Sequence, residues 1–394
     1  MKEKVYGWIF DKKAPEYLRK TELPAKYTTR KNEILIVLFL LGLMAISITE
    51  LYLGAGIDSV KNQIKYYILG IIIAILIRNK NEFLEKSSMT IIGIAVILLM
   101  LLKSPFGMNI NGVARCLRLG PVMFFPIYIF MWAYILMFGL ALKNTKESLS
   151  GKYGSCIRPW GISAISGLLV IIFADQNPML TYIFVIAMAV SKYILGYKNL
   201  HKIGLLIVGL ISALGMAIYV NFSYYSYHAR RIMAWFHPED YAKTDAYETM
   251  VMFDIVKNMR FLGHRRYDLG YISRMPSAFS DNMFVTVLDE LGGLAAILCV
   301  ICLLALVYNI YNVFKLANKE KNTQGSIVVL GVLVHLLSMA AVNVLISFNF
   351  LPKTGAIFPI LSATSGNVFY LAEIGMVLYV LKTINKLNAE ERVN

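Results

Sequence analysis

The chain has 394 residues, of which 58% are hydrophobic and 16% charged, and its mean hydropathy is +0.61. Apolar runs long enough to cross a bilayer recur along its whole length, which excludes a soluble globular protein, and their lack of alternation excludes a transmembrane barrel. The formal net charge of +15 comes from Lys and Arg in short loops between these runs. It therefore indicates the positive-inside pattern of a membrane protein and not a nucleic-acid partner.

The apolar runs predict an all-α polytopic membrane protein with about ten transmembrane helices. A basic tail, 1–31, contains no span and shows no cleavable signal. Seven spans are expected within 32–220 and three within 282–386, followed by a short tail, 387–394. The expected spans are 32–54, 63–78, 88–103, 121–142, 159–174, 178–196, 203–220, 282–309, 326–349 and 366–386.

Loop charges orient these spans. The two tails and the Lys- and Arg-rich loops fall on one side, which predicts a multi-pass protein with both termini cytoplasmic. The outer side then carries 104–120, 350–365 and the long segment 221–281 between spans seven and eight. Segments of this length inside a compact protein are usually functional. Within it, Asp245–Leu262 has helical periodicity, typical either of a helix on the outer membrane surface or of one packed on the bundle.

Three carboxylates, Asp281, Asp289 and Glu290, lie close together where the eighth span is expected to begin. A charge at membrane depth is usually paired, lined by water or functional. Asp281 follows Ser280, a suitable N-cap residue. Asp281 is therefore either a functional residue or one that only stabilises the N-terminus of the helix. Asp289 is about 80° around the helix from Asp281, and Glu290 faces the opposite way. We therefore expect the two inner carboxylates to link the bundle, by pairing with Arg or Lys from another span or by capping backbone near Gly292–Gly293.

The outer side also carries arginines, which the positive-inside bias does not explain. Guanidinium groups bind phosphates through paired hydrogen bonds, so anionic headgroups or phosphates are candidate ligands. Neutralisation by local acidic residues is the alternative. These arginines are Arg115 and Arg118 in the 104–120 loop and Arg230, Arg231, Arg260, Arg265, Arg266 and Arg274 in the long segment.

Four motifs occur in order along the chain. Asn111–Pro121, NGVARCLRLGP, is similar to N-G-A-R-R-W-I-R-L-G-P, and Arg230–Asp240 is similar to R-I-x-x-F-x-D-P. Pro276–Gly292 is similar to L-P-E-x-H-T-D-F-I-F-x-x-x-x-E-E-L-G. Asn343, followed by PKTG at Pro352–Gly355 and by Pro359 and Ser362, is similar to N-x-G…P-x-T-G-I-P-L-P-F-I-S-Y-G-G-S. Over about residues 30–386, the chain thus resembles the SEDS family (shape, elongation, division and sporulation).

The resemblance implies a ten-span fold and a peptidoglycan glycosyltransferase that polymerises lipid II at the outer face of the bacterial cytoplasmic membrane. It also implies a class B penicillin-binding protein as partner, and it does not separate elongation, division and sporulation. The family's loop aspartate maps onto Asp281, which would act as general base. The expected substrate contacts are Arg115, Arg118, Arg231, Arg274 and Ser362, and the expected structural positions are Pro276, Asp289, Glu290, Asn343, Pro352, Thr354, Gly355 and Pro359.

A divalent cation, Mg²⁺ or Mn²⁺, at the lipid diphosphate is compatible with this chemistry, although no ligand cluster in the sequence identifies it. Two other functions remain as alternatives. A flippase for lipid-linked sugars would need a polar path across the bilayer, and the cytoplasmic halves of the spans offer few charges. A non-catalytic scaffold for a penicillin-binding protein would tolerate loss of motif residues.

The chain departs from the family pattern in several places. The family's F-Q-P-S-E-L-x-K reads FFPIYIFM here, so the intramembrane Glu and Lys become Tyr128 and Met131. Because both charged residues are replaced together, no unpaired charge is left inside the membrane. The other replaced positions are Cys116, Phe125, Ile127, Glu248, Phe279, Asp289 and Ala363–Gly366.

Overall fold

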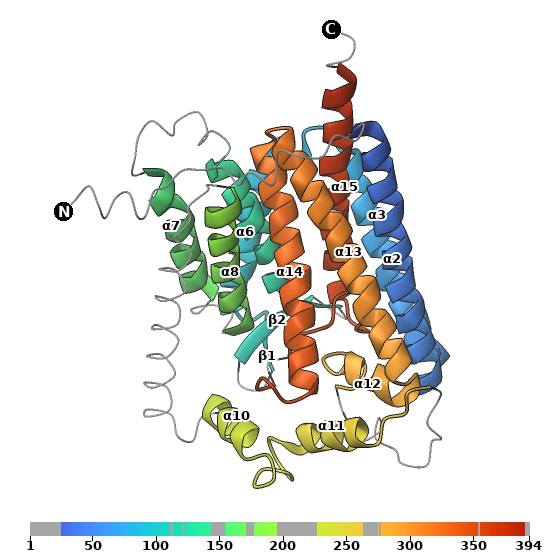
Figure 1. Cartoon of the computed structure of the whole chain (residues 1–394). Coiled ribbons are helices and arrows are strands. Elements are labelled where there is room, and N and C mark those ends of the chain that lie inside the picture. Colours follow the sequence, from blue (N-terminus) through green and yellow to red (C-terminus); the bar gives the residue numbers. More distant parts are fainter. Residues whose placement is uncertain are drawn as a thin grey trace, which may run out of the picture.

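The structure is a computed structural model, and it describes residues 25–110, 113–119, 122–142, 154–170, 177–194, 227–262, 275, 277–353 and 355–390. Over these residues the chain forms a bundle of roughly aligned helices, with a small sheet and three short helices between Tyr227 and Glu290 toward one end (Figure 1). The expected span 203–220 lies outside the described residues.

The first half of the bundle follows the expected order of spans. Its helices are α2 (Ala25–Gly54), α3 (Ile57–Asn79), α4 (Phe83–Lys86), α5 (Ser88–Leu101), α6 (Pro126–Leu142), α7 (Gly154–Leu169) and α8 (Asn177–Tyr193). The second half comprises α10 (Tyr227–Phe236), α11 (Tyr247–Lys257), α12 (Met283–Glu290), α13 (Gly293–Lys319), α14 (Thr323–Ser347) and α15 (Gly366–Glu390).

Five of the described helices are long and apolar enough to cross a membrane. Large apolar side chains such as Leu38, Leu76 and Ile301 remain exposed on them, as expected of helices that face lipid. These five are Thr29–Gly54, Ile57–Asn79, Gly293–Lys319, Thr323–Ser347 and Gly366–Lys386, and Ser88–Leu101 and Pro126–Leu142 are shorter apolar helices.

A three-stranded antiparallel sheet precedes α6, so the expectation of a purely helical chain is wrong in this segment. Its strands are β1 (Gly107–Ile110), β2 (Val113–Leu119) and β3 (Val122–Phe124), in the order β1-β2-β3. The expected span 121–142 therefore begins only at Pro126. Proline suits the first turn of a helix and disfavours helical geometry in the residue before it, which explains the boundary.

The expected span 282–309 is also wrong, because it is two helices. α12 ends at Glu290, and Gly292 takes a φ of 87° before α13 begins. The first backbone N–H groups of α13 are capped by the segment that follows α11. Gly293 donates to the carbonyl of Arg260 at 2.8 Å, and Leu294 donates to that of Phe261 at 2.9 Å. The span itself therefore runs from Gly293 to Lys319.

The bundle positions α10, α11 and α12 at one end, while α15 finishes at the opposite end (Figure 1). α15 packs along α3, α13 packs along α2 and α14, and α11 packs on α12. α11 buries Val251, Met252 and Ile255. Of the two positions considered for the periodic segment, the structure has the helix packed on the bundle, and it is shorter than Asp245–Leu262.

Candidate active site

Asp281 lies in the turn Ser277–Asn282, directly before α12. The turn is closed by the backbone N–H of Asn282, which donates to the carbonyl of Ser277 at 3.1 Å. The Ser280 hydroxyl donates to the same carbonyl at 3.3 Å. The expected N-cap role of Ser280 is therefore wrong: Asn282 occupies that position, and the helix begins at Met283. Asp281 stands at the helix entrance and is partly exposed.

A second segment, the loop 348–365 between α14 and α15, lies against this turn. Side chains from α2, α3, α10 and α14 donate to its backbone carbonyls, which is why it holds one shape without regular structure. The bonds run from Trp235 to Asn349 (2.9 Å), Arg231 to Lys353 (3.0 Å), Asn343 to Ala356 (2.6 Å), Tyr67 to Ile360 (2.7 Å) and Ser47 to Leu361 (2.7 Å).

The anchoring sustains a strained backbone at Ile360. This residue has a φ of 67°, which is a genuine outlier for a β-branched side chain. Such strain persists only where the surroundings over-determine the conformation. The bonds from Tyr67 and Ser47 supply that constraint, because they hold the carbonyls of Ile360 and Leu361 in the two peptides that follow.

Asn343 joins the turn to the loop. Its side-chain amide donates to the carbonyl of Asp281 at 2.7 Å and to that of Ala356 at 2.6 Å. A further bond runs from the backbone N–H of Ala363 to the carbonyl of Phe279 at 2.7 Å. The backbone of Asp281 is thus fixed by α14 and by the loop together.

The Asp281 carboxylate faces Gly355. Gly355 has a φ of 73°, and a Cβ placed on it would lie 3.3 Å from Asp281 Oδ2. The backbone conformation therefore favours glycine, and a larger residue would also press on the Asp281 carboxylate. The carboxylate also acts electrostatically on Tyr128, whose ring stacks on Phe369 at 5.1 Å between centroids. Met131 is fully buried, so the positions of the family's Glu and Lys are filled by packed side chains.

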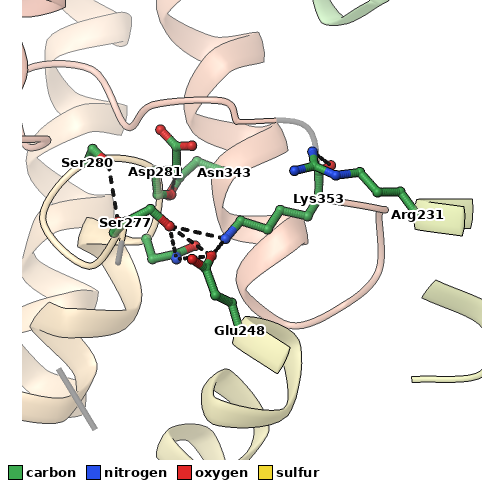
Figure 2. Close-up of polar contacts among 8 residues, drawn as sticks. Arg231, Glu248, Ser277, Ser280, Asp281, Asn343 and Lys353 are labelled. Carbon is green, nitrogen blue, oxygen red and sulfur yellow. Dashed lines mark hydrogen bonds and ion pairs between the residues drawn. The ribbon is translucent and has the colours of Figure 1, made fainter. Parts of the chain in front are cut away.

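Beside Asp281 lies an ionic network that joins α11 to the loop (Figure 2). Glu248 forms an ion pair with Lys353, and it accepts hydrogen bonds from the Ser277 hydroxyl at 2.8 Å and the Asn282 amide at 3.2 Å. Lys353 also donates to the Ser277 hydroxyl at 3.1 Å. Burial, with the neighbouring Arg231 guanidinium, lowers the pKa of Lys353 from 10.5 to about 7.

The structure brings one of the expected arginines to this loop. Arg231, on α10, donates to the Lys353 carbonyl. Arg115 and Arg118 lie on β2, where Arg118 is exposed, and the sheet is at the same end of the bundle as α12 (Figure 1). Arg274 lies outside the described residues.

Ser362 belongs to the framework of the loop. Its side chain is fully buried, and its hydroxyl accepts the backbone N–H of Phe358 at 2.9 Å. Pro352 and Pro359 lie in the same loop, whereas Pro276 and Thr354 lie outside the described residues.

The two inner carboxylates are buried in α12, as a role inside the bundle would require. Asp289 and Glu290 are each 7% exposed, and both act electrostatically on Glu50 of α2, which is fully buried. The expected capping of Gly292–Gly293 is wrong, because the Arg260 carbonyl receives the Gly293 N–H.

Sequence reasoning missed two paired polar contacts. The first is Glu248 with Lys353, for which the signal was a lysine on the outer side against the positive-inside bias. The second lies deep in the bundle, where His335 of α14 and Glu373 of α15 are joined at 2.7 Å. The rings of Tyr182 and Tyr370 flank His335 at 4.7 and 5.2 Å between centroids.

Comparison with known proteins gives concordant results. A model of the FtsW/RodA/SpoVE family, described as "Cell cycle protein", matches residues 30–386. The chain is similar to the probable peptidoglycan glycosyltransferase FtsW of Legionella pneumophila, with 25% identity over 335 residues that cover 84% of this chain and 82% of the relative. Similarity to the protein of the same name from Thioalkalivibrio sulfidiphilus is 24% over 360 residues, covering 88% of each.

Two solved structures share the fold. One, described as "Structural coordination of polymerization and crosslinking by a peptidoglycan synthase complex", contains a chain with a TM-score of 0.70 at 17% identity, covering 89% of this chain and 97% of that one. The other is the rod shape determining protein RodA of Thermus thermophilus, with a TM-score of 0.60 at 17% identity, covering 88% and 95%.

The resemblance to the SEDS family is thereby confirmed over nearly the whole sequence. Since the matched region runs from the start of the first span into α15, the chain belongs to the FtsW/RodA/SpoVE family of membrane proteins.

Proposed function

We propose that this protein is a peptidoglycan glycosyltransferase that polymerises lipid II, with Asp281 as general base. The observation that carries the proposal is the double fixation of Asp281 by Asn343 and the loop 348–365. A base must be held within hydrogen-bond reach of the proton that it removes, and a rigid turn and loop provide such a support. Relatives named as probable peptidoglycan glycosyltransferases support the reaction class.

In this reaction a hydroxyl of the acceptor sugar attacks the anomeric carbon of the donor. The new glycosidic C–O bond forms as the bond to the lipid diphosphate breaks, and Asp281 takes the hydroxyl proton. The diphosphate leaves with the electron pair, and cationic side chains stabilise it. Arg231 and the arginines of β2 are candidates for that stabilisation, as are Arg274 and other arginines of the long segment.

A divalent cation at the diphosphate belongs to the same proposal. The described residues contain no group of three or more His, Cys, Asp or Glu side chains that could hold a metal ion. Mg²⁺ is commonly bound by one or two carboxylates together with substrate phosphates and water. Asp281 would be the protein ligand in that arrangement, and the cation would supply charge neutralisation at the leaving group.

The proposal sets the protein in the bacterial cytoplasmic membrane with ten spans and both termini in the cytoplasm. Segment 221–281 would then lie on the outer face, as one domain with spans 32–220 and 282–386. A class B penicillin-binding protein is the proposed partner. The likeness to a chain of a peptidoglycan synthase complex supports this assignment.

The test is polymerisation of labelled lipid II by purified protein in proteoliposomes with its penicillin-binding protein. Wild type should form glycan strands, and Asp281→Asn should lose at least about 100-fold of the rate, the lower range for a general base. Asp254→Asn, an exposed aspartate on α11, is the matched control and should retain full activity.

Three outcomes would overturn the proposal. Undiminished polymerisation by Asp281→Asn would exclude Asp281 as the general base. Normal cell-wall complementation by Asp281→Ala would favour the scaffold function. Transfer of labelled headgroups across the bilayer without glycan synthesis would instead favour the flippase.

A further inference from the structure

The ion pair between Glu248 and Lys353 is only partly sheltered. Their side chains are 20% and 16% exposed respectively, and they come from separate elements, α11 and the loop 348–365. An ion pair that remains reachable from one side can exchange one of its partners for an ionic ligand.

Glu248 and Lys353 differ in how many hydrogen-bond partners each keeps when the ion pair breaks. Glu248 keeps two other donors, the Ser277 hydroxyl and the Asn282 amide, so its carboxylate stays hydrogen-bonded if Lys353 moves. Lys353 carries three N–H groups, of which Glu248 and Ser277 account for two among the described residues. The lysine is therefore the group that can move to an incoming anion while the carboxylate left behind keeps two hydrogen-bond donors.

The backbone beneath this lysine is fixed whichever partner its side chain takes. Arg231 donates to the Lys353 carbonyl at 3.0 Å. Only the side chain has to turn, and it is long and flexible. Figure 2 shows the Arg231 bond on the opposite side of Lys353 from Glu248.

The pair also lies beside the proposed base. Asn282, which binds Glu248, is the neighbour of Asp281, and Gly355, which faces the Asp281 carboxylate, is two residues from Lys353. The carboxylate of Asp281 is turned away from the pair (Figure 2). The base and the cation thus share one site without neutralising each other there.

We propose that Lys353 binds a phosphate oxygen of the lipid diphosphate, and that Glu248 holds this lysine in place while the site is empty. The proposal rests on the proposed function, since it deepens the same site. A phosphate oxygen and a carboxylate oxygen accept from an ammonium in the same way, so the exchange replaces one anionic partner of Lys353 by another.

The test is binding, measured without turnover, on full-length protein in detergent micelles at pH 6. The probes are farnesyl diphosphate, farnesyl monophosphate and inorganic pyrophosphate, titrated by calorimetry. Lys353→Met should weaken farnesyl diphosphate binding at least about 10-fold, the scale of one hydrogen bond to a charged group. Lys353→Arg should retain most of the affinity, and Lys257→Met, which removes an exposed lysine from α11, should leave it unchanged.

Glu248→Gln provides the opposite change. Its amide oxygen can still accept from Ser277 and Asn282, but it no longer competes for the ammonium, so affinity for the diphosphate should rise several-fold at pH values where Lys353 of the variant stays protonated. Equal affinity of wild type and Lys353→Met would overturn the inference, as would weaker binding by Glu248→Gln at those pH values. If Lys353→Met loses the same affinity for inorganic pyrophosphate as for farnesyl diphosphate, the lysine contacts the phosphates alone. If it loses affinity only for farnesyl diphosphate, the lipid chain also contributes to recognition.

The two proposals fail separately. If the protein makes no glycan but its diphosphate binding depends on Lys353, the inference holds and the proposed reaction is excluded. If Asp281→Asn abolishes glycan synthesis while Lys353→Met changes neither rate nor KM, the proposed reaction holds and the inference is excluded.

Discussion

The side-chain amide of Asn343 binds the backbone carbonyl of Asp281 at 2.7 Å and that of Ala356 at 2.6 Å. One residue of α14 thereby sets the distance between the turn that carries the base and the loop opposite it. Because both acceptors are backbone atoms, the arrangement does not depend on the protonation state of Asp281. This relationship makes Asn343 the most direct structural control over the base.

Asn343→Ala should reduce polymerisation about 10- to 100-fold, since a displacement of the base by about 1 Å has effects of that size. Two carbonyls would also lose their donor, which should destabilise the fold by about 1–3 kcal/mol. Activity and thermal unfolding in micelles measure the two effects. Asn309→Ala removes a comparable amide, bonded to Ala305 at 2.7 Å within α13, and should leave the rate unchanged.

Gly355→Ala should lower activity through a contact with the base. The substitution brings a Cβ to 3.3 Å from Asp281 Oδ2 at a φ of 73°, and the left-handed conformation costs about 1–2 kcal/mol for an alanine. Gly56→Ala provides the matched control, because Gly56 has a φ of 78° with nothing within 4 Å of the added atom. We expect similar losses of stability and a loss of rate only at Gly355; equal rates would contradict the role of this contact.

Diphosphate binding should depend on pH through Lys353. Phosphate binds the ammonium, and the pKa of Lys353 is lowered to about 7, so affinity should fall as the pH rises through that value. Glu248 favours the charged form. Glu248→Gln should therefore lower this pKa further and move the loss of affinity to lower pH, whereas an unshifted profile would exclude Lys353 as the titrating group.

The same lowered pKa has a consequence for stability. The unfolded chain keeps the lysine proton up to about pH 10.4, whereas the folded chain releases it near 7. The unfolded state thus binds more protons between these values, and the contribution of Lys353 to the free energy of unfolding should rise across that window.

Glu373→Leu should strongly destabilise the bundle. The change leaves His335 buried at 1% exposure without the carboxylate that binds its ring Nδ1, and a buried polar group without its hydrogen-bond partner costs about 1–3 kcal/mol. The double change His335→Leu and Glu373→Leu should recover most of that loss, because apolar residues can replace such a pair. Thermal unfolding of the three proteins measures the difference, and a double variant as unstable as the single one would contradict this account.

Motif spacing in the sequence predicts that Asp281, Asn343 and Gly355 belong to one set. The structure brings the three together, with the Asn343 amide on the Asp281 carbonyl and Gly355 facing its carboxylate. Hydropathy likewise identified the long helices, since an apolar run of sufficient length is a direct signal.

Other features leave no local signal. Continuous apolar character through 291–298 conceals the break at Gly292, which depends on two backbone carbonyls after α11 that accept from the first N–H groups of α13. The sequence predicts loop and span where β1, β2 and β3 form a sheet, because these strands are short and belong to no long alternating run. The bond from Ser47 to Leu361 joins residues 314 positions apart, and no periodicity predicts a side chain bound to a distant backbone carbonyl.

The anchoring of the loop 348–365 by α2 and α3 has a consequence for genetics. Ser47 and Tyr67 lie in apolar helices, yet their hydroxyls hold the carbonyls of Leu361 and Ile360. Substitutions such as Ser47→Ala and Tyr67→Phe preserve hydropathy and should not impair membrane insertion. A screen for alleles that accumulate normally but fail to support growth should therefore recover these helix positions together with Asp281.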